Sequence, residues 1–124
     1  MKQLIIEGTK FSPRVELNPN GHIKLEGRSI IENPFHFFNP VFRWIKSVNF
    51  NTVNVSIKLD YLNTGSVKQL YTLLTLIREN RSIKNIYINW YYEEGDDDCF
   101  ELGKDIESQI SLPFDFFELS ETTA

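Results

Sequence analysis

The feature that most constrains the fold is a change of hydrophobic period around residues 63–66. Over residues 53–61, apolar side chains alternate with polar ones, which is typical of a strand with one buried face. Over residues 67–80, apolar side chains recur at helical spacing, which predicts a helix with one buried face. The chain is therefore expected to fold around a strand–turn–helix unit whose turn is polar.

Two functions are open for Thr64 in this turn. Ser66 and Gln69 form a capping-box pattern, which predicts Ser66 as the N-cap and places Thr64 just ahead of the helix. Unpaired N–H groups and the helix dipole favour an anion there, so a phosphate on Thr64 would be stabilised. The alternative is that Thr64 is an ordinary turn residue whose hydroxyl caps the helix.

The remaining pattern alternates strands with helices. Asn33-Pro34 and Asn39-Pro40 both signal helix starts, so we expect a turn from residue 34, a break near Asn39 and a main helix over residues 40–47. Gly27 is expected to end a hairpin that turns at Asn20-Gly21. Strands are predicted at residues 2–7, 15–17, 22–25, 83–92 and 114–119. A further helix is predicted at residues 100–110, and residues 120–124 are expected to fray.

This order predicts a single α/β domain spanning residues 1–124. N-terminal β-hairpin elements come first, and α-β-α-β-α-β follows. Strands that alternate with helices indicate a mixed, largely parallel sheet. The strand at residues 83–92 carries large apolar groups on both faces, so we expect it in the interior of the sheet.

Charge is distributed unevenly along the chain. Residues 1–50 and 51–92 each have a net charge of +3, whereas residues 93–124 have −10. The acidic third argues against nucleic-acid binding through that surface. Cys99 is the only cysteine, and the chain lacks a long apolar run, so we expect a cytoplasmic protein with no membrane span.

No pattern of an enzyme or metal site is present. The acidic loop, residues 93–98, lacks the spacing of a calcium loop, and its carboxylates are explained by a helix start; a surface for a basic partner is the alternative. Cys99 could pair with His22 or His36 as nucleophile and base, but the sequence around them does not support it. We therefore expect no catalytic residue, no metal and no cofactor.

Phe37 and Trp44 are predicted to lie off the buried face of the helix at residues 40–47. The expected buried face consists of Phe35, Phe38, Val41, Phe42 and Ile45. A wide buried stripe along the helix is the favoured interpretation of these aromatic residues, and a surface that contacts a partner is the alternative.

Three blocks of the sequence together resemble the SiaC family of bacterial regulatory phosphoproteins. They are residues 33–44, residues 59–66 and residues 89–94 with the acidic residues that follow. The resemblance implies a fold similar to the STAS-like anti-sigma-factor antagonists and no enzymatic activity. It also implies that a cognate kinase phosphorylates the turn threonine, which matches Thr64, and that a PP2C-type phosphatase removes the phosphate. In the best-known system of this family, the unphosphorylated form activates a diguanylate cyclase.

One position departs from the family pattern. Gly65 stands where the family often has serine, and Ser66 remains as an alternative phosphorylation site. The candidate partner-binding residues are Asn63, Gly65, Ser66, Lys68, Trp44 and Phe37. The competing hypothesis is a sensor that binds free phosphate or a nucleotide at the helix start after Thr64.

Overall fold

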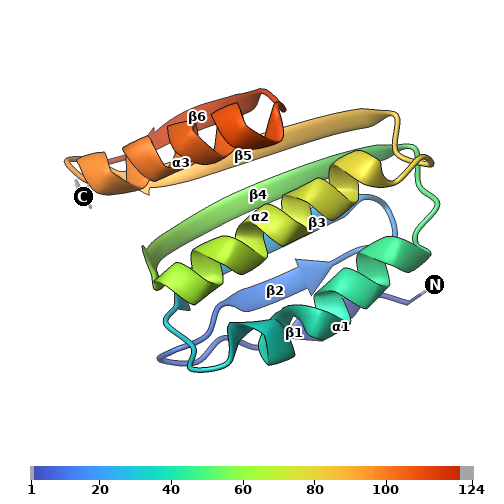
Figure 1. Ribbon diagram of the computed structural model, residues 1–124, viewed down its shortest axis with the longest axis horizontal. Helices are drawn as coiled ribbons and strands as arrows, with labels where there is room; N and C mark the ends of the chain where they lie inside the picture. The colour runs from blue at the N-terminus through green and yellow to red at the C-terminus, as the bar shows by residue number, and fades with distance from the viewer. Residues whose placement is uncertain (1, 121–124) are drawn as a thin grey trace.

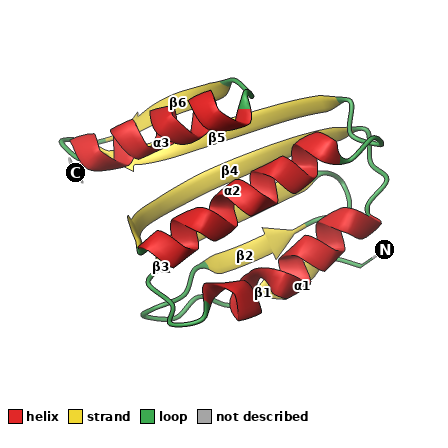
Figure 2. Cartoon of the chain, viewed as in Figure 1, coloured by secondary structure: helices red, strands yellow, loops and turns green. Residues whose placement is uncertain are grey.

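In the described part of the chain, six strands form one sheet, and three helices cover one of its faces (Figures 1 and 2). The computed structural model describes residues 2–120. The elements in chain order are β1 (Leu4–Ile6), β2 (Arg14–Leu17), β3 (His22–Ser29), α1 (Pro34–Ser47), β4 (Thr52–Leu62), α2 (Thr64–Glu79), β5 (Asn85–Glu93), α3 (Asp97–Ile110) and β6 (Phe114–Leu119). The expected α/β class and order of elements are confirmed. The predicted fraying of residues 120–124 lies outside the described residues, except for Ser120.

The strands lie side by side in the order of the sequence, β1-β2-β3-β4-β5-β6. The pairs β1–β2 and β2–β3 are antiparallel, as the predicted hairpin elements require. The pairs β3–β4, β4–β5 and β5–β6 are parallel, and a helix connects each pair. The sheet is therefore mixed and largely parallel, as expected.

The core lies between the sheet and the helices. Alternate residues of each central strand point into it, and Val53, Val55 and Ile57 of β4 are fully buried. From the helices, Ile45, Leu74 and Ile106 meet them in one continuous apolar cluster. None of the helices in residues 2–120 is long and apolar enough to cross a bilayer.

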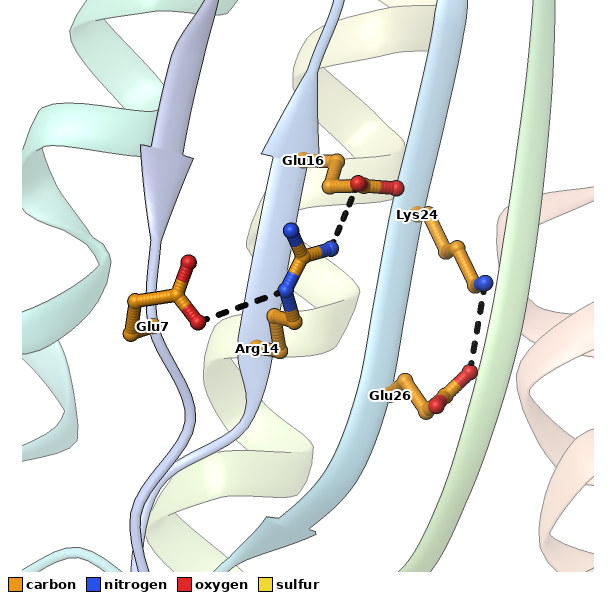
Figure 3. Close-up of polar contacts among 5 residues, drawn as sticks. All are labelled: Glu7, Arg14, Glu16, Lys24 and Glu26. Atoms are coloured by element: carbon orange, nitrogen blue, oxygen red, sulfur yellow. Dashed lines mark ion pairs between the residues drawn. The ribbon is translucent and has the colours of Figure 1, made fainter.

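The other face of the sheet carries charged side chains. Figure 3 shows Arg14 of β2 between Glu7 and Glu16, and Lys24 beside Glu26 on β3. Ion pairs of this kind between exposed groups contribute little to stability, about 0–1 kcal/mol each. They keep this half of the uncovered face polar.

Three sequence expectations about the elements are wrong. Gly27 does not end its strand: β3 continues to Ser29, and the register with β4 shifts between Gly27, which has a φ of 114°, and Arg28. Such a bulge places an extra residue in one strand without ending it.

Helix α1 has no break either, because Pro40 lies inside a helix that runs from Pro34 to Ser47. An internal proline removes one backbone hydrogen bond, and the packing of α1 against the core compensates for that loss.

The third correction concerns two residues of α1, because Phe38, Val41, Phe42 and Ile45 are buried as predicted. Trp44 is buried and Phe35 is exposed, which is the reverse of the prediction. β5 does lie inside the sheet, between β4 and β6, as expected. Its second face is not covered by a helix, so Tyr87 remains exposed there.

Candidate functional site

Thr64 is the first residue of α2, directly after the end of β4. The carboxyl ends of the parallel strands and the first turns of all three helices meet at this edge, which we call the carboxyl end of the sheet (Figure 1). Thr64 is exposed, as predicted, but it is the first residue of the helix and does not lie in a turn ahead of it. Its hydroxyl makes no hydrogen bond to any residue in the described part of the chain.

Asn63 is the N-cap of α2. Its Oδ1 accepts a hydrogen bond from the N–H of Ser66 at 2.9 Å, and its Nδ2 donates to the carbonyl of Ile31 at 2.9 Å. Its backbone N–H donates to the carbonyl of Ser29 at 3.0 Å. Asn63 therefore ties the helix start to the segment after β3 and fixes the turn from both sides.

Ser66 is not the N-cap, so this prediction is wrong. It is the third residue of α2 and is fully buried, and the hydroxyl of Ser29 donates a hydrogen bond to its Oγ at 2.6 Å. The cap is Asn63 because asparagine is at least as good an acceptor for the first turn as serine. The burial of Ser66 also removes it as an accessible phosphorylation or partner-binding residue.

The capping alternative for Thr64 is also wrong, since the Asn63 amide performs that function. The exposed hydroxyl of Thr64 is therefore not needed to start the helix. Neither α1 nor α2 has an acidic residue in its first turn, whereas α3 has Asp97 and Asp98. An added negative charge on Thr64 would face the positive end of α2 without a carboxylate in that turn to repel it.

Gly65 allows the first turn of α1 to pack against the first turn of α2. A Cβ atom on Gly65 would lie only 2.9 Å from Cγ of Pro34. Real Cβ atoms do not come that close, so a larger residue here would require Pro34 to move. The glycine that departs from the family pattern thus has a packing reason in this chain.

The other sequence candidates lie in different environments. Lys68 is exposed and follows Thr64 by four residues, so both side chains lie on one side of α2. Phe37 is half-buried, and its ring packs edge-on against Phe38 at 5.0 Å between centroids. Trp44 is buried near the other end of α1: its Nε1 donates to the carbonyl of Lys2 at 2.9 Å, and its ring packs against Phe50. Trp44 therefore does not qualify as a partner contact.

Exposed apolar residues at this end were missed by the sequence analysis. Phe35 is in the first turn of α1, Tyr61 is near the end of β4, and Phe11 and Ile30 lie in the loops after β1 and β3. The available signal was the position of Phe35 directly after Pro34, in the first turn of α1. No periodicity marks Phe11 or Ile30, because loops have none.

The acidic loop and Cys99 lie beside the ends of β4 and β5. Asp96 caps α3 by accepting a hydrogen bond from the N–H of Cys99 at 3.0 Å. Burial, together with the charge of Asp96, raises the pKa of the Cys99 thiol to about 11, so the thiol stays protonated and is a weak nucleophile. Among residues 2–120, no three His, Cys, Asp or Glu side chains are placed to hold a metal ion together.

A cavity of about 170 Å³ opens at this end, and none of its lining residues belongs to the helix start after Thr64, where the sensor hypothesis places its ligand. Its lining includes four carboxylates and one lysine: Glu26, Asp60, Glu93, Asp96 and Lys58. These charges would repel a phosphate or a nucleotide. The strand order β3-β4-β5-β6 also never reverses, so this sheet lacks the switch point at which doubly wound sheets bind ligands.

Comparisons with known proteins agree on one family. The family model described as SiaC family regulatory phosphoprotein matches residues 6–119. An uncharacterised protein of Pseudomonas aeruginosa strain UCBPP-PA14 is 26% identical over 119 residues, which cover 92% of this chain and 94% of that protein.

Solved structures give the same result. SiaC of Pseudomonas aeruginosa is 25% identical and superimposes with a TM-score of 0.85 over 96% of this chain and 100% of that one. A crystal structure of the diguanylate cyclase SiaD in complex with its activator SiaC, from the same organism, matches with a TM-score of 0.84 at 25% identity. That match covers 94% of this chain and 99% of the matched chain.

Proposed function

Since the chain belongs to the SiaC family of regulatory phosphoproteins, we propose that Thr64 is its phosphorylation site and that the phosphate selects its protein partners. The observation that carries this proposal is the exposed hydroxyl of Thr64, which no described residue engages, on a helix start that Asn63 holds. A kinase can use this hydroxyl without removing an interaction on which the fold depends.

Local electrostatics support the proposal. A phosphate brings about −1.5 to −2 charges and strong acceptor oxygens. At the first residue of α2 these oxygens face free backbone N–H groups, and Lys68 lies four residues further along the same side of the helix. The phosphorylated chain is therefore expected to keep its fold, so the modification changes the surface.

The proposed partners are a cognate kinase, a PP2C-type phosphatase and an output protein. A diguanylate cyclase is the first candidate for the output protein, because the SiaC protein in the solved complex is described as the activator of one. In this proposal the unphosphorylated chain binds the cyclase and so controls cyclic di-GMP. Residues 1–124 act as one regulatory, non-enzymatic domain in the cytoplasm, where the kinase has access to ATP.

The test incubates the chain with ATP and each candidate kinase of the source organism, and mass spectrometry locates the phosphate. We expect one phosphate, on Thr64, that is absent from Thr64→Ala. Thr72→Ala is the matched control, because Thr72 is another exposed threonine on α2 and its loss should leave labelling unchanged. Phosphate on any other residue, or none with any kinase, would contradict the proposal.

The same samples separate the switch from the sensor hypothesis. A phosphate or nucleotide sensor would be stabilised by the free ligand, so its melting temperature would rise with ATP or inorganic phosphate alone. The proposed switch predicts no such rise without a kinase.

A further inference from the structure

Strand β6 forms one edge of the sheet, and no strand within residues 2–120 pairs with its outer side (Figure 1). The carbonyl of Leu119 accepts a hydrogen bond from the N–H of Glu94 at 2.8 Å, so the backbone groups of Leu119 face β5. Alternate residues of a paired strand direct these groups to opposite sides, so those of Phe116 and Glu118 face the open edge. The N–H of Phe114 faces the same way and donates to Glu107 Oε2 at 2.8 Å, so the free edge begins at Phe116.

β6 lacks most of the features that keep an edge strand from pairing. Protected edges are commonly very short, contain proline or a bulge, or carry lysine. β1, at the opposite edge, has three residues, whereas β6 has six, and its sequence contains neither proline nor lysine. Its register with β5 also continues without a shift. The backbone of β6 is therefore able to accept another strand.

A row of aromatic side chains lies beside this edge, on the face of the sheet that no described helix covers. Tyr87 is 51% exposed and Phe117 is 43% exposed. Phe117 is the register partner of Tyr91, and their rings stack with 5.0 Å between centroids. A strand added to β6 would place a side chain directly beside Phe117, where an apolar group buries surface with it.

The charges of this region are mainly negative. Residues 93–124 have a net charge of −10, and Asp115 and Glu118 are exposed on β6 itself. Lys104, the one basic residue of α3, is already paired with Glu107 at 3.4 Å. Two copies of the chain that paired through β6 would bring two such acidic regions together, so electrostatics disfavour that dimer and favour a cationic partner.

We propose that the open edge of β6 binds an extended, cationic segment of another protein, which adds to the sheet as a further strand. Backbone hydrogen bonds with Phe116 and Glu118 supply affinity, and the flanking side chains supply specificity. The order acidic–aromatic–aromatic–acidic over residues 115–118 fits a segment in which two apolar residues stand between lysine or arginine residues. This order is symmetric, so it fits either strand direction.

This inference goes beyond the proposed function. Thr64 begins the helix that follows β4, and β5 lies between β4 and β6. The edge of β6 is therefore a second binding surface, and a phosphate on Thr64 should change the affinity of the cationic segment by less than about twofold.

The test is a titration of the isotope-labelled full chain with synthetic peptides, followed by nuclear magnetic resonance. The probe has Lys-Val-Val-Lys between three threonines on each side, with both ends blocked. The control has Val-Lys-Lys-Val between the same threonines, so composition and charge are equal. The probe should bind at least about fivefold more tightly than the control. It should also slow hydrogen exchange at Phe116 and Glu118, whereas Asp115 and Phe117, which pair with β5, should change little.

Two variants test the edge itself. Glu118→Pro removes an N–H that faces the open edge, which an edge strand tolerates, so the chain should fold and lose probe binding. Asp115→Lys should weaken probe binding by about fivefold or more. Glu32→Lys is its matched control, because Glu32 is exposed before α1 and the change in net charge is the same. Melting curves check that each variant folds.

The outcomes distinguish this inference from the proposed function. Equal binding of probe and control, or exchange that slows elsewhere than β6, would overturn the inference, because net charge alone would then explain the attraction. A dimer of the chain that Glu118→Pro abolishes, detected by sedimentation, would assign the edge to a second copy and overturn it too. Either result leaves phosphorylation of Thr64 as a separate question, which the kinase assay decides.

Discussion

The side chains of Asn63 and Thr64 are adjacent in sequence, and the structure gives them separate tasks. Asn63 supplies the cap of α2 and the link to Ile31, whereas the Thr64 hydroxyl makes no hydrogen bond within residues 2–120. Losing an asparagine cap costs about 0.5–2 kcal/mol, and the Ile31 carbonyl would also lose its donor. A surface substitution without such a partner stays within about 0.5 kcal/mol.

We therefore predict that Asn63→Ala lowers the free energy of unfolding by about 1–3 kcal/mol and that Thr64→Ala changes it by less than about 0.5 kcal/mol. Urea denaturation of both variants measures the difference. Asn63→Asp is the control, because it keeps the capping oxygen and loses only the donor to Ile31, so it should fall between the two. Equal losses for Asn63→Ala and Thr64→Ala would mean that Thr64 also stabilises the helix start.

The raised pKa of the Cys99 thiol predicts how the free energy of unfolding depends on pH. Its thiol pKa is raised by burial and by Asp96 to about 11, from an ordinary value of 9.0, so folding favours the protonated thiol. The stability that results is fully present below about pH 9 and is lost as the pH rises toward 11. The free energy of unfolding should fall more steeply over this range in wild type than in Cys99→Ala. Identical slopes would show that the thiol is not shielded in the folded protein.

At the scale of elements, the first turns of α1 and α2 are packed against each other through Pro34 and Gly65. A Cβ at residue 65 would meet Cγ of Pro34 at 2.9 Å. We predict that Gly65→Ala destabilises the protein, with overpacking costs of about 1–3 kcal/mol. Pro34→Ala in the same chain should recover most of the loss, and a double-mutant cycle of unfolding free energies measures the coupling. Additive losses would show that the contact with Pro34 is not the cause.

Prediction of the element types from the sequence succeeded where the hydrophobic period was strong. The change of period across residues 63–66 placed β4 and α2 correctly, because each buries one face against the core. It failed where two local signals competed. The Ser66–Gln69 pattern suggested a cap two residues inside the real helix, because Asn63 offers an equally good acceptor earlier in the chain. Pro40 likewise suggested a break, but burial of Val41, Phe42 and Ile45 holds α1 together.

At the scale of the whole molecule, the sheet order explains where the candidate site lies. Each parallel connection adds its strand on the same side of the previous one, so crossovers of one hand place all three helices on one face. The loops at the carboxyl end of the sheet then follow one another from Phe11 to the acidic loop, with Thr64 between them. No local pattern in the sequence could show that Phe11, Ile30, Phe35 and Tyr61 gather there, because their neighbourhood exists only in the assembled sheet.

The uneven distribution of charge along the chain also determines which charges lie beside the candidate site. The turn that carries Thr64 has Arg28 and Lys68 near it, and the next loop along the same edge carries the carboxylates of Glu93 and Asp96. The proposed phosphate on Thr64 would therefore extend the acidic part of this edge toward Arg28 and Lys68. That change is large enough to alter which protein surface the edge can meet.

The most direct test of this account is a calorimetric titration of the diguanylate cyclases of the source organism with three forms of the chain. The forms are the unphosphorylated wild type, the wild type phosphorylated on Thr64, and Thr64→Ala after treatment with the kinase. If phosphorylation of Thr64 is the switch, one cyclase binds the first and third forms equally and binds the phosphorylated form at least about tenfold more weakly. Equal binding of all three forms would contradict it and would return Thr64 to the status of an ordinary helix-start residue.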